Sequence, residues 1–281
     1  MNGLAFGLVE AAPGMSGGTI AIMLGFYNEL IETVNHFTKD FKKHTKFGLP
    51  IVAGIATGML ISFTIIKYLL DAFRFPTMAF FIGLIVGIIP LIFRKVKRAN
   101  HWFTLKEMTL ILLPFLVLVI LSFLKPITIA NSADNISIPF MLYIAITGII
   151  AASALVIPGT SGMFMLLLLG VYELVVDSFN SLIHLLTNTS LILPIAKVLV
   201  PLAVGIIIGV LTMARLIEKL LKNHYKTTYC IILGLLAGSV FAIFKEQLFA
   251  QSDLSAWSVI IGIFTLCAGS MLSFRLGKSR L

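Results

Sequence analysis

Charged residues are scarce in this sequence. Asp, Glu, Lys and Arg make up 12% of its 281 residues, whereas apolar residues make up 59%. A soluble domain of ordinary composition carries about 25% charged residues, so these charges cannot cover a water-facing surface. The apolar residues form long continuous segments, which are typical of membrane-spanning helices and not of the short alternating strands of a transmembrane β-barrel. The sequence therefore predicts an all-α integral membrane protein.

Cysteine is also rare. Cys230 and Cys267 both lie in apolar segments and lack the spacing of metal ligands, so we predict no metal site and no cofactor. The 21 basic residues outnumber the 12 acidic ones, but they lie in short segments between the apolar ones, as the positive-inside rule describes. The positive charge therefore indicates a membrane topology and not a nucleic-acid partner.

The most informative feature is an internal repeat. Pro-Gly-Met-Ser-Gly at 13–17 recurs as Pro-Gly-Thr-Ser-Gly at 158–162, and Leu-Gly-Phe-Tyr at 24–27 recurs as Leu-Gly-Val-Tyr at 169–172. Small and turn-forming residues further along match in the same order: Pro50, Gly54, Gly58, Thr77, Gly83 and Gly87 with Pro201, Gly205, Gly209, Thr228, Gly234 and Gly238. Glycines spaced four residues apart favour close helix packing, which we predict at Gly54/Gly58 and Gly205/Gly209.

We predict one membrane domain built from two repeats, 1–135 and 136–281. Each repeat begins with a broken helical hairpin and continues with three transmembrane helices. The hairpins are expected at about 3–36 and 139–186, and the spans at about 47–70, 76–94, 107–125, 195–218, 227–245 and 256–275. Pro-Gly stops the helix in each hairpin, and Ser161 is expected to cap the next one. The first arm is too short to cross the bilayer, so we expect a re-entrant hairpin; a fully spanning one would keep the same parity.

Loop charges predict the topology. If both hairpins return to the side that they entered, four segments with nearly all the basic residues share one face: 39–46, 94–106, 215–226 and 275–280. The segments on the other face are close to neutral: 71–75, 125–137, 186–193 and 245–255. The basic face is expected to be cytoplasmic, with both termini inside. Because three full spans per half is an odd number, the halves are predicted to be inverted-topology repeats, an architecture typical of secondary transporters.

Both Pro-Gly-x-Ser-Gly tips open a helix, where unpaired N–H groups and the helix dipole favour an anion. Glycines allow a ligand to approach the backbone closely, and hydroxyl groups add donors. We predict a cradle for phosphate or carboxylate that comprises Gly14, Ser16, Gly17, Gly18, Thr19, Gly159, Thr160, Ser161 and Gly162. The alternative is that each motif is only a helix break with a cap.

Few charged residues lie near these tips. Glu10 lies three residues before Pro13 in an apolar arm, and an intramembrane carboxylate is a candidate for proton coupling. The alternative is a glutamate that bonds to nearby backbone or reaches water. Arg215 and Lys67 lie towards the ends of their spans and are secondary candidates for an anion path; the alternative is that they extend to the interface.

Two segments resemble the signatures of the bacterial PopT polyprenyl-phosphate transporters. Residues 10–21, Glu-Ala-Ala-Pro-Gly-Met-Ser-Gly-Gly-Thr-Ile-Ala, followed by Gly-Phe-Tyr at 25–27, are similar to the first. Residues 158–162, followed by Leu-Leu-Leu-Gly-Val-Tyr-Glu at 167–173, are similar to the second. The resemblance covers nearly the whole chain, and its motif positions include Glu10. It implies a flippase, not an enzyme, that returns undecaprenyl phosphate, the lipid carrier of cell-wall synthesis, across the bacterial plasma membrane.

Two other functions stay open. A small-anion transporter or channel could use the same tips, and nothing in the residues excludes it. An undecaprenyl-diphosphate phosphatase would also have inverted re-entrant hairpins and a Pro-Gly-x-Ser motif, but there an arginine follows the serine and paired glutamates serve the chemistry. Here Gly17 and Gly162 follow the serines, which leaves a phosphoryl transition state without a cationic clamp. Bilayer lipids are expected partners, and a homodimer is compatible with the sequence.

Overall fold

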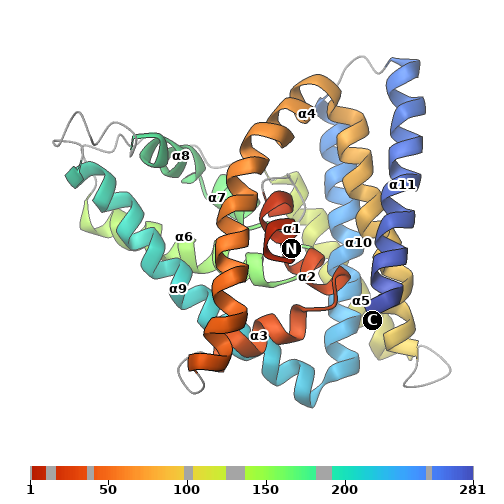
Figure 1. The fold of residues 1–281 in the computed structure, drawn as a ribbon, viewed down its shortest axis with the longest axis horizontal. Coiled ribbons are helices and arrows are strands. Elements are labelled where there is room, and N and C mark those ends of the chain that lie inside the picture. Colours follow the sequence, from red (N-terminus) through yellow and green to blue (C-terminus); the bar gives the residue numbers. More distant parts are fainter. Residues whose placement is uncertain are drawn as a thin grey trace. The chain divides into compact units, whose positions relative to one another are not determined.

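The computed structural model describes residues 2–10, 17–36, 41–97, 104–124, 137–181, 192–250 and 255–280. Secondary structure in these ranges is helical throughout (Figure 1). The chain divides into two compact units. Unit 1 comprises Met1–Phe123, Ile157–Thr160 and Ala214–Leu281, and unit 2 comprises Leu124–Val156 and Ser161–Met213.

Unit 1 contains most of the long helices. Its elements are α1 (Asn2–Glu10), α2 (Gly17–Met23), α3 (Tyr27–His36), α4 (Phe41–Lys97), α5 (Leu105–Phe123), the end of α9 (Ile192–Asn223), α10 (Tyr225–Ala250) and α11 (Ala256–Arg280). Unit 2 contains α6 (Ile138–Val156), α7 (Gly162–Leu168), α8 (Tyr172–Ser181) and the rest of α9.

Helix α4 consists of two helices joined at a kink, which is visible in Figure 1 as the orange helix that turns back on itself. Phe73 has non-helical backbone angles, φ −139° and ψ 51°. Pro76 favours a break here because its ring crowds the carbonyl four residues earlier and it cannot donate a backbone hydrogen bond. The Thr77 hydroxyl donates to the Phe73 carbonyl at 2.7 Å. Thr228, its match in the second half, donates to the His224 carbonyl at 2.9 Å, where α9 gives way to α10.

In each half, glycines bring the helix before the Pro-Gly motif, α1 or α6, against the first long helix after it, α4 or α9. In unit 1, a Cβ at Gly54 would lie 2.8 Å from the Leu4 nitrogen, and one at Gly58 would lie 2.4 Å from the Leu4 oxygen. In unit 2, a Cβ at Gly205 would lie 2.1 Å from the Ala145 oxygen. Gly209 packs in the same way one turn later, 2.5 Å from the Ile149 oxygen. The close packing predicted at both glycine pairs is confirmed.

A second set of glycines joins helices from different halves. A Cβ at Gly83 on α4 would lie 2.2 Å from the Leu266 oxygen on α11, and Gly87 approaches the Ser270 oxygen equally closely. A Cβ at Gly234 on α10 would lie 2.1 Å from the Ile111 oxygen on α5. The second part of α4 therefore packs along α11, and α10 packs along α5.

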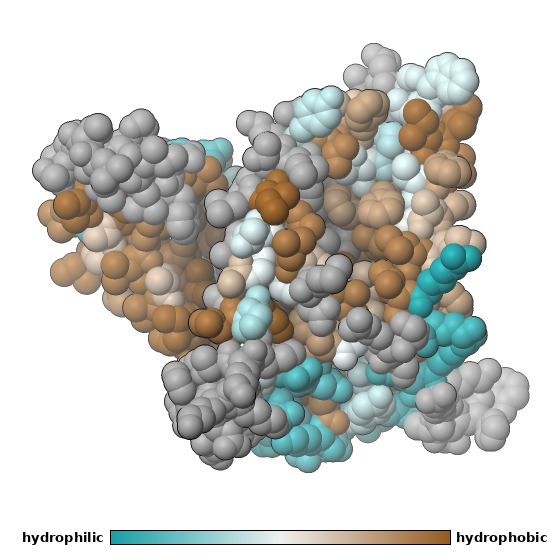
Figure 2. All heavy atoms as spheres, in the orientation of Figure 1, coloured by the Kyte–Doolittle hydropathy of each residue, from teal (hydrophilic) through white to brown (hydrophobic). Residues whose placement is uncertain are grey.

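Three of the basic segments meet at one end of unit 1. Lys95, near the end of α4, reaches Tyr229 at the start of α10, with Nζ 3.4 Å from the phenol oxygen. Lys226 forms an ion pair of 2.5 Å with Glu107 at the start of α5. The end of α11 lies beside the end of α4, because these two helices run parallel. Figure 2 shows hydrophilic residues gathered at this end of unit 1.

Six of the helices within the described ranges are long and apolar enough to cross a membrane. They are Ala72–Val96, Leu105–Phe123, Ile138–Val156, Ile192–Asn223, Tyr225–Lys245 and Ala256–Lys278. This confirms an all-helical, multi-pass membrane protein. Helix α6 has 19 residues, enough for a full crossing, whereas α1 has nine.

A side chain at Gly205 is expected to destabilise unit 2. In Gly205→Leu, the new Cβ meets the Ala145 carbonyl oxygen on the backbone of α6, so α6 and α9 must separate. Overpacking of this kind costs roughly 1–3 kcal/mol, and we expect a lower midpoint of thermal unfolding in detergent. Ile207→Ala is the control, since Ile207 is 59% exposed on the same helix. An unchanged midpoint in Gly205→Leu would contradict this packing.

Candidate functional site

The second Pro-Gly-x-Ser-Gly tip is a capped break between two helices. Helix α6 ends at Val156, and α7 begins at Gly162. The Ser161 backbone is extended, with φ −105° and ψ 126°. Its side-chain oxygen accepts a hydrogen bond from the Phe164 N–H at 3.4 Å. It thereby satisfies one of the N–H groups that the start of a helix leaves unpaired. The N-cap predicted at Ser161 is confirmed.

The first tip is described only in part. Helix α1 ends at Glu10 and α2 begins at Gly17. The predicted cradle residues Gly14 and Ser16 lie outside the described residues, as does the side chain of Glu10. Gly17, Gly18 and Thr19 open α2, and every residue of this helix is buried.

The turn that follows each tip has the same structure in both halves. Gly25 has φ +74° and Gly170 has φ +73°, a left-handed conformation that suits glycine. Phe26 N–H donates to the Ala21 carbonyl at 3.0 Å, and Val171 N–H donates to the Leu166 carbonyl at 3.1 Å. These are glycine C-caps of the Schellman kind. The sequence repeat is thus also a repeat of local structure.

The second tip contacts α2, the helix that follows the first tip, within unit 1. The Gly159 N–H donates to the Thr19 hydroxyl oxygen at 3.0 Å, a bond between residues 140 positions apart. Thr19 is 2% exposed. Nearby, the Thr160 hydroxyl donates to the Ile157 carbonyl at 3.0 Å. Thr19 of α2 and Gly159 of the second motif are therefore in buried polar contact.

Helix α10 fixes the position of the second tip. Gly159 has φ +88°, and a Cβ there would lie 2.9 Å from the Leu235 carbonyl carbon and 3.0 Å from the Leu236 nitrogen. The backbone of the tip therefore lies directly on the backbone of α10. Only glycine readily adopts this left-handed φ and also lacks the Cβ for which there is no space here.

The glycine after each serine approaches protein atoms. A Cβ at Gly17 would lie 2.1 Å from the Phe6 ring of α1, and one at Gly162 would lie 2.8 Å from the Ala151 oxygen of α6. Both glycines therefore allow the second arm of a hairpin to pack on the first.

The secondary charge candidates, Arg215 and Lys67, lie on α9 and α4. Arg215 is exposed on α9, as expected for a residue that extends to the interface. Lys67 lies on α4, but its side chain is outside the described part of the structure. The described residues contain no group of three or more His, Cys, Asp or Glu that could hold a metal ion.

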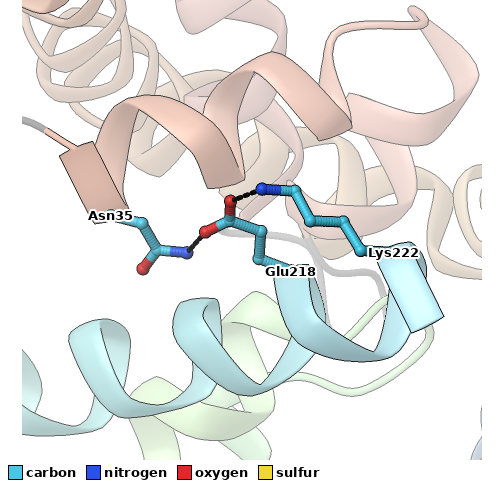
Figure 3. Close-up of polar contacts among 3 residues, drawn as sticks. All are labelled: Asn35, Glu218 and Lys222. Carbon is cyan, nitrogen blue, oxygen red and sulfur yellow. Dashed lines mark hydrogen bonds and ion pairs between the residues drawn. The ribbon is translucent and has the colours of Figure 1, made fainter.

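Sequence reasoning did not single out a polar network at the end of α3. Figure 3 shows Glu218 of α9 between Asn35 of α3 and Lys222. The Asn35 amide donates to one carboxylate oxygen at 2.6 Å, and Lys222 contacts the other at 2.5 Å. Because Glu218 lies 183 positions after Asn35, no local sequence pattern indicates that these two residues bond to each other.

Sequence reasoning also missed a matched pair of cation–ring contacts. Lys245 lies 3.7 Å from the centroid of the Phe123 ring and donates to the Ser122 carbonyl at the end of α5. Arg94 lies 5.9 Å from the centroid of the Phe274 ring on α11. The sequence repeat aligns Arg94 with Lys245 and Phe123 with Phe274. Each contact therefore fastens the third helix of one half to the second helix of the other.

Comparison with known proteins gives two curated relatives. A polyprenyl-phosphate transporter of Staphylococcus aureus is 31% identical over 286 residues, which cover 99% of this chain and 95% of the relative. A polyprenyl-phosphate transporter of Vibrio cholerae is 25% identical over 254 residues, which cover 85% of this chain and 75% of the relative. No solved structure matches. Both relatives are named as transporters and not as enzymes, which agrees with the prediction of a non-enzymatic protein. The model of the undecaprenyl phosphate translocase-like family matches residues 6–260, and the chain belongs to this family.

Proposed function

We propose that this chain transports polyprenyl phosphate, of the undecaprenyl type, across the bacterial plasma membrane. The family match and the names of the two relatives support this substrate. The six long apolar helices support a membrane carrier. The basic end of unit 1 is the cytoplasmic one in this proposal, with both termini inside, because basic residues concentrate on that side of bacterial membranes.

The carrier is built from two inverted repeats. The end of α4 lies at the start of α10 while these two helices pack together, so these matched helices run antiparallel. Each matched third helix, α5 or α11, packs on the other half. The contacts of Lys245 with Phe123 and of Arg94 with Phe274 are related in the same way. A pseudo-twofold axis in the membrane plane accounts for all three observations.

The phosphate headgroup binds where the two tips meet. The observation that carries this proposal is the buried bond between Gly159 and Thr19. It supports a common site for motifs that sequence alone only places at matched positions. Backbone N–H groups and hydroxyls of the two tips bind the anion without a full positive charge, so the headgroup can also leave. The polyprenyl tail stays in the bilayer while the headgroup moves.

Flipping of a fluorescent polyprenyl phosphate in proteoliposomes tests this function. We expect reconstituted protein to move the lipid between leaflets, and protein-free vesicles to show no such movement. The same vesicles loaded with inorganic phosphate or chloride test the alternative of a small-anion transporter. Flux of these anions without lipid flipping, from folded protein, would overturn the proposal.

Protonation of Glu10 drives transport in this proposal, because an acidic residue in an apolar arm is expensive unless it has a function. Wild-type flipping should change when a pH gradient is imposed, and Glu10→Gln should flip at a rate that the gradient does not alter. Glu29→Gln is the matched control, since Glu29 is exposed at the start of α3. Gradient-sensitive flipping by Glu10→Gln would remove Glu10 from the mechanism.

A further inference from the structure

The Thr19–Gly159 hydrogen bond occupies the Gly159 N–H, which the proposed phosphate site needs as a donor. A backbone N–H donates one hydrogen bond under ordinary geometry, so Gly159 cannot bond well to Thr19 and to a phosphate oxygen together. The distance of 3.0 Å and the burial of both residues make this an ordinary, well-formed bond. In the described conformation, the Gly159 N–H of the second tip is therefore occupied by Thr19 of α2.

The Thr19 side of the bond is the one that can yield. Gly159 is held by the backbone of α10, with its left-handed angle and less than 3 Å between an added Cβ and Leu235. Thr19 lies on α2, a helix of seven residues that follows the first tip. A rotation of the Thr19 side chain would release the Gly159 N–H without disturbing α10.

We propose that Thr19 is an internal competitor for the headgroup: its hydroxyl oxygen takes the place of a phosphate oxygen at the Gly159 N–H, and the headgroup displaces it. This inference rests on the proposed function. A hydrogen bond to an ionised oxygen is roughly twice as strong as one to a neutral hydroxyl, so the phosphate replaces Thr19 when it enters. When the phosphate leaves, Thr19 satisfies the buried N–H again. Exchange of this kind lowers the barrier to release, which a transporter needs.

The ligand chemistry recognised here is a phosphate monoester or phosphate anion.

Removing the Thr19 hydroxyl distinguishes a competitor role of Thr19 from a direct contact between Thr19 and the phosphate, because the two roles change binding in opposite directions. If Thr19 only donates to the phosphate, Thr19→Val weakens binding. If Thr19 competes with the phosphate, Thr19→Val destabilises the unliganded tip, because the Gly159 N–H loses its partner, and binding tightens. The size of a typical buried hydrogen bond predicts about five- to tenfold tighter binding.

The experiment measures binding of a polyprenyl phosphate to wild-type and variant protein in nanodiscs, with inorganic phosphate as a second probe. Thr19→Ser keeps an acceptor and should bind like wild type. Thr147→Val is the control for loss of a buried hydroxyl, since Thr147 is 1% exposed and bonds within α6. Thr19→Ala is the second variant if Thr19→Val does not fold.

Tighter binding by Thr19→Val or Thr19→Ala, with Thr19→Ser and Thr147→Val unchanged, supports the competitor role. Equal or weaker binding overturns it, even where wild-type protein binds the lipid and the proposed function stands. Binding of inorganic phosphate alone, again tighter in Thr19→Val, supports the competitor role and contradicts the lipid substrate. Absence of binding by wild-type protein to either probe overturns both.

Discussion

Replacing Gly159 with alanine is expected to reduce flipping of polyprenyl phosphate by at least about tenfold. Alanine at φ +88° costs roughly 1–2 kcal/mol. Its Cβ would also lie 2.9 Å from the Leu235 carbonyl carbon, a backbone atom that cannot move aside, and overpacking adds roughly 1–3 kcal/mol. The tip must then leave α10, and the N–H that meets Thr19 moves with it.

Gly170→Ala is the matched control for this prediction. Gly170 has φ +73°, so alanine carries a similar backbone strain there, but the turn lies after α7 and away from the tip along the chain. Flipping is measured in proteoliposomes at equal protein content, and thermal unfolding reports folding. If Gly159→Ala flips lipid as fast as Gly170→Ala, the geometry of the second tip does not matter for transport.

Removal of the two matched serine hydroxyls should reduce flipping still further. In Ser16→Ala/Ser161→Ala, each tip loses the side chain predicted to donate to the phosphate. A hydrogen bond to a charged group contributes about 1.5–3 kcal/mol, so each loss corresponds to roughly a 10- to 100-fold effect. Ser161→Ala also loses the cap on α7, which costs about 1 kcal/mol. The double variant should fold and retain little activity.

Ser178→Ala provides the comparison for loss of a buried serine. Ser178 is 4% exposed, and its hydroxyl donates to the Leu174 carbonyl within α8. It should flip lipid at the wild-type rate. The double variant is compared with it by size-exclusion profile and by unfolding temperature. Normal flipping by a folded double variant would contradict the phosphate cradle.

Features that depend on local chemistry could be predicted from the sequence. The cap at Ser161 follows from a serine after Pro-Gly at the start of a helix. The close packing at Gly54 and Gly205 follows from glycines spaced by one turn.

Features that depend on distant partners could not be predicted. Nothing local indicates that Thr19 accepts from Gly159, because both residues have ordinary roles near a helix start. The pairing of Lys245 with Phe123 requires knowing that α10 packs on α5. The sequence repeat aligned Arg94 with Lys245, but alignment alone does not distinguish packing within a half from packing between halves.

The most direct test of the shared headgroup site is an experimental structure of this chain in nanodiscs with polyprenyl phosphate bound. The account predicts phosphate density between the two Pro-Gly-x-Ser-Gly tips, within hydrogen-bond distance of the Gly159 N–H and of residues of the first tip. The Thr19 hydroxyl should then have moved away from Gly159. Phosphate density at the basic end of unit 1, with the Thr19–Gly159 bond intact, would contradict the shared site.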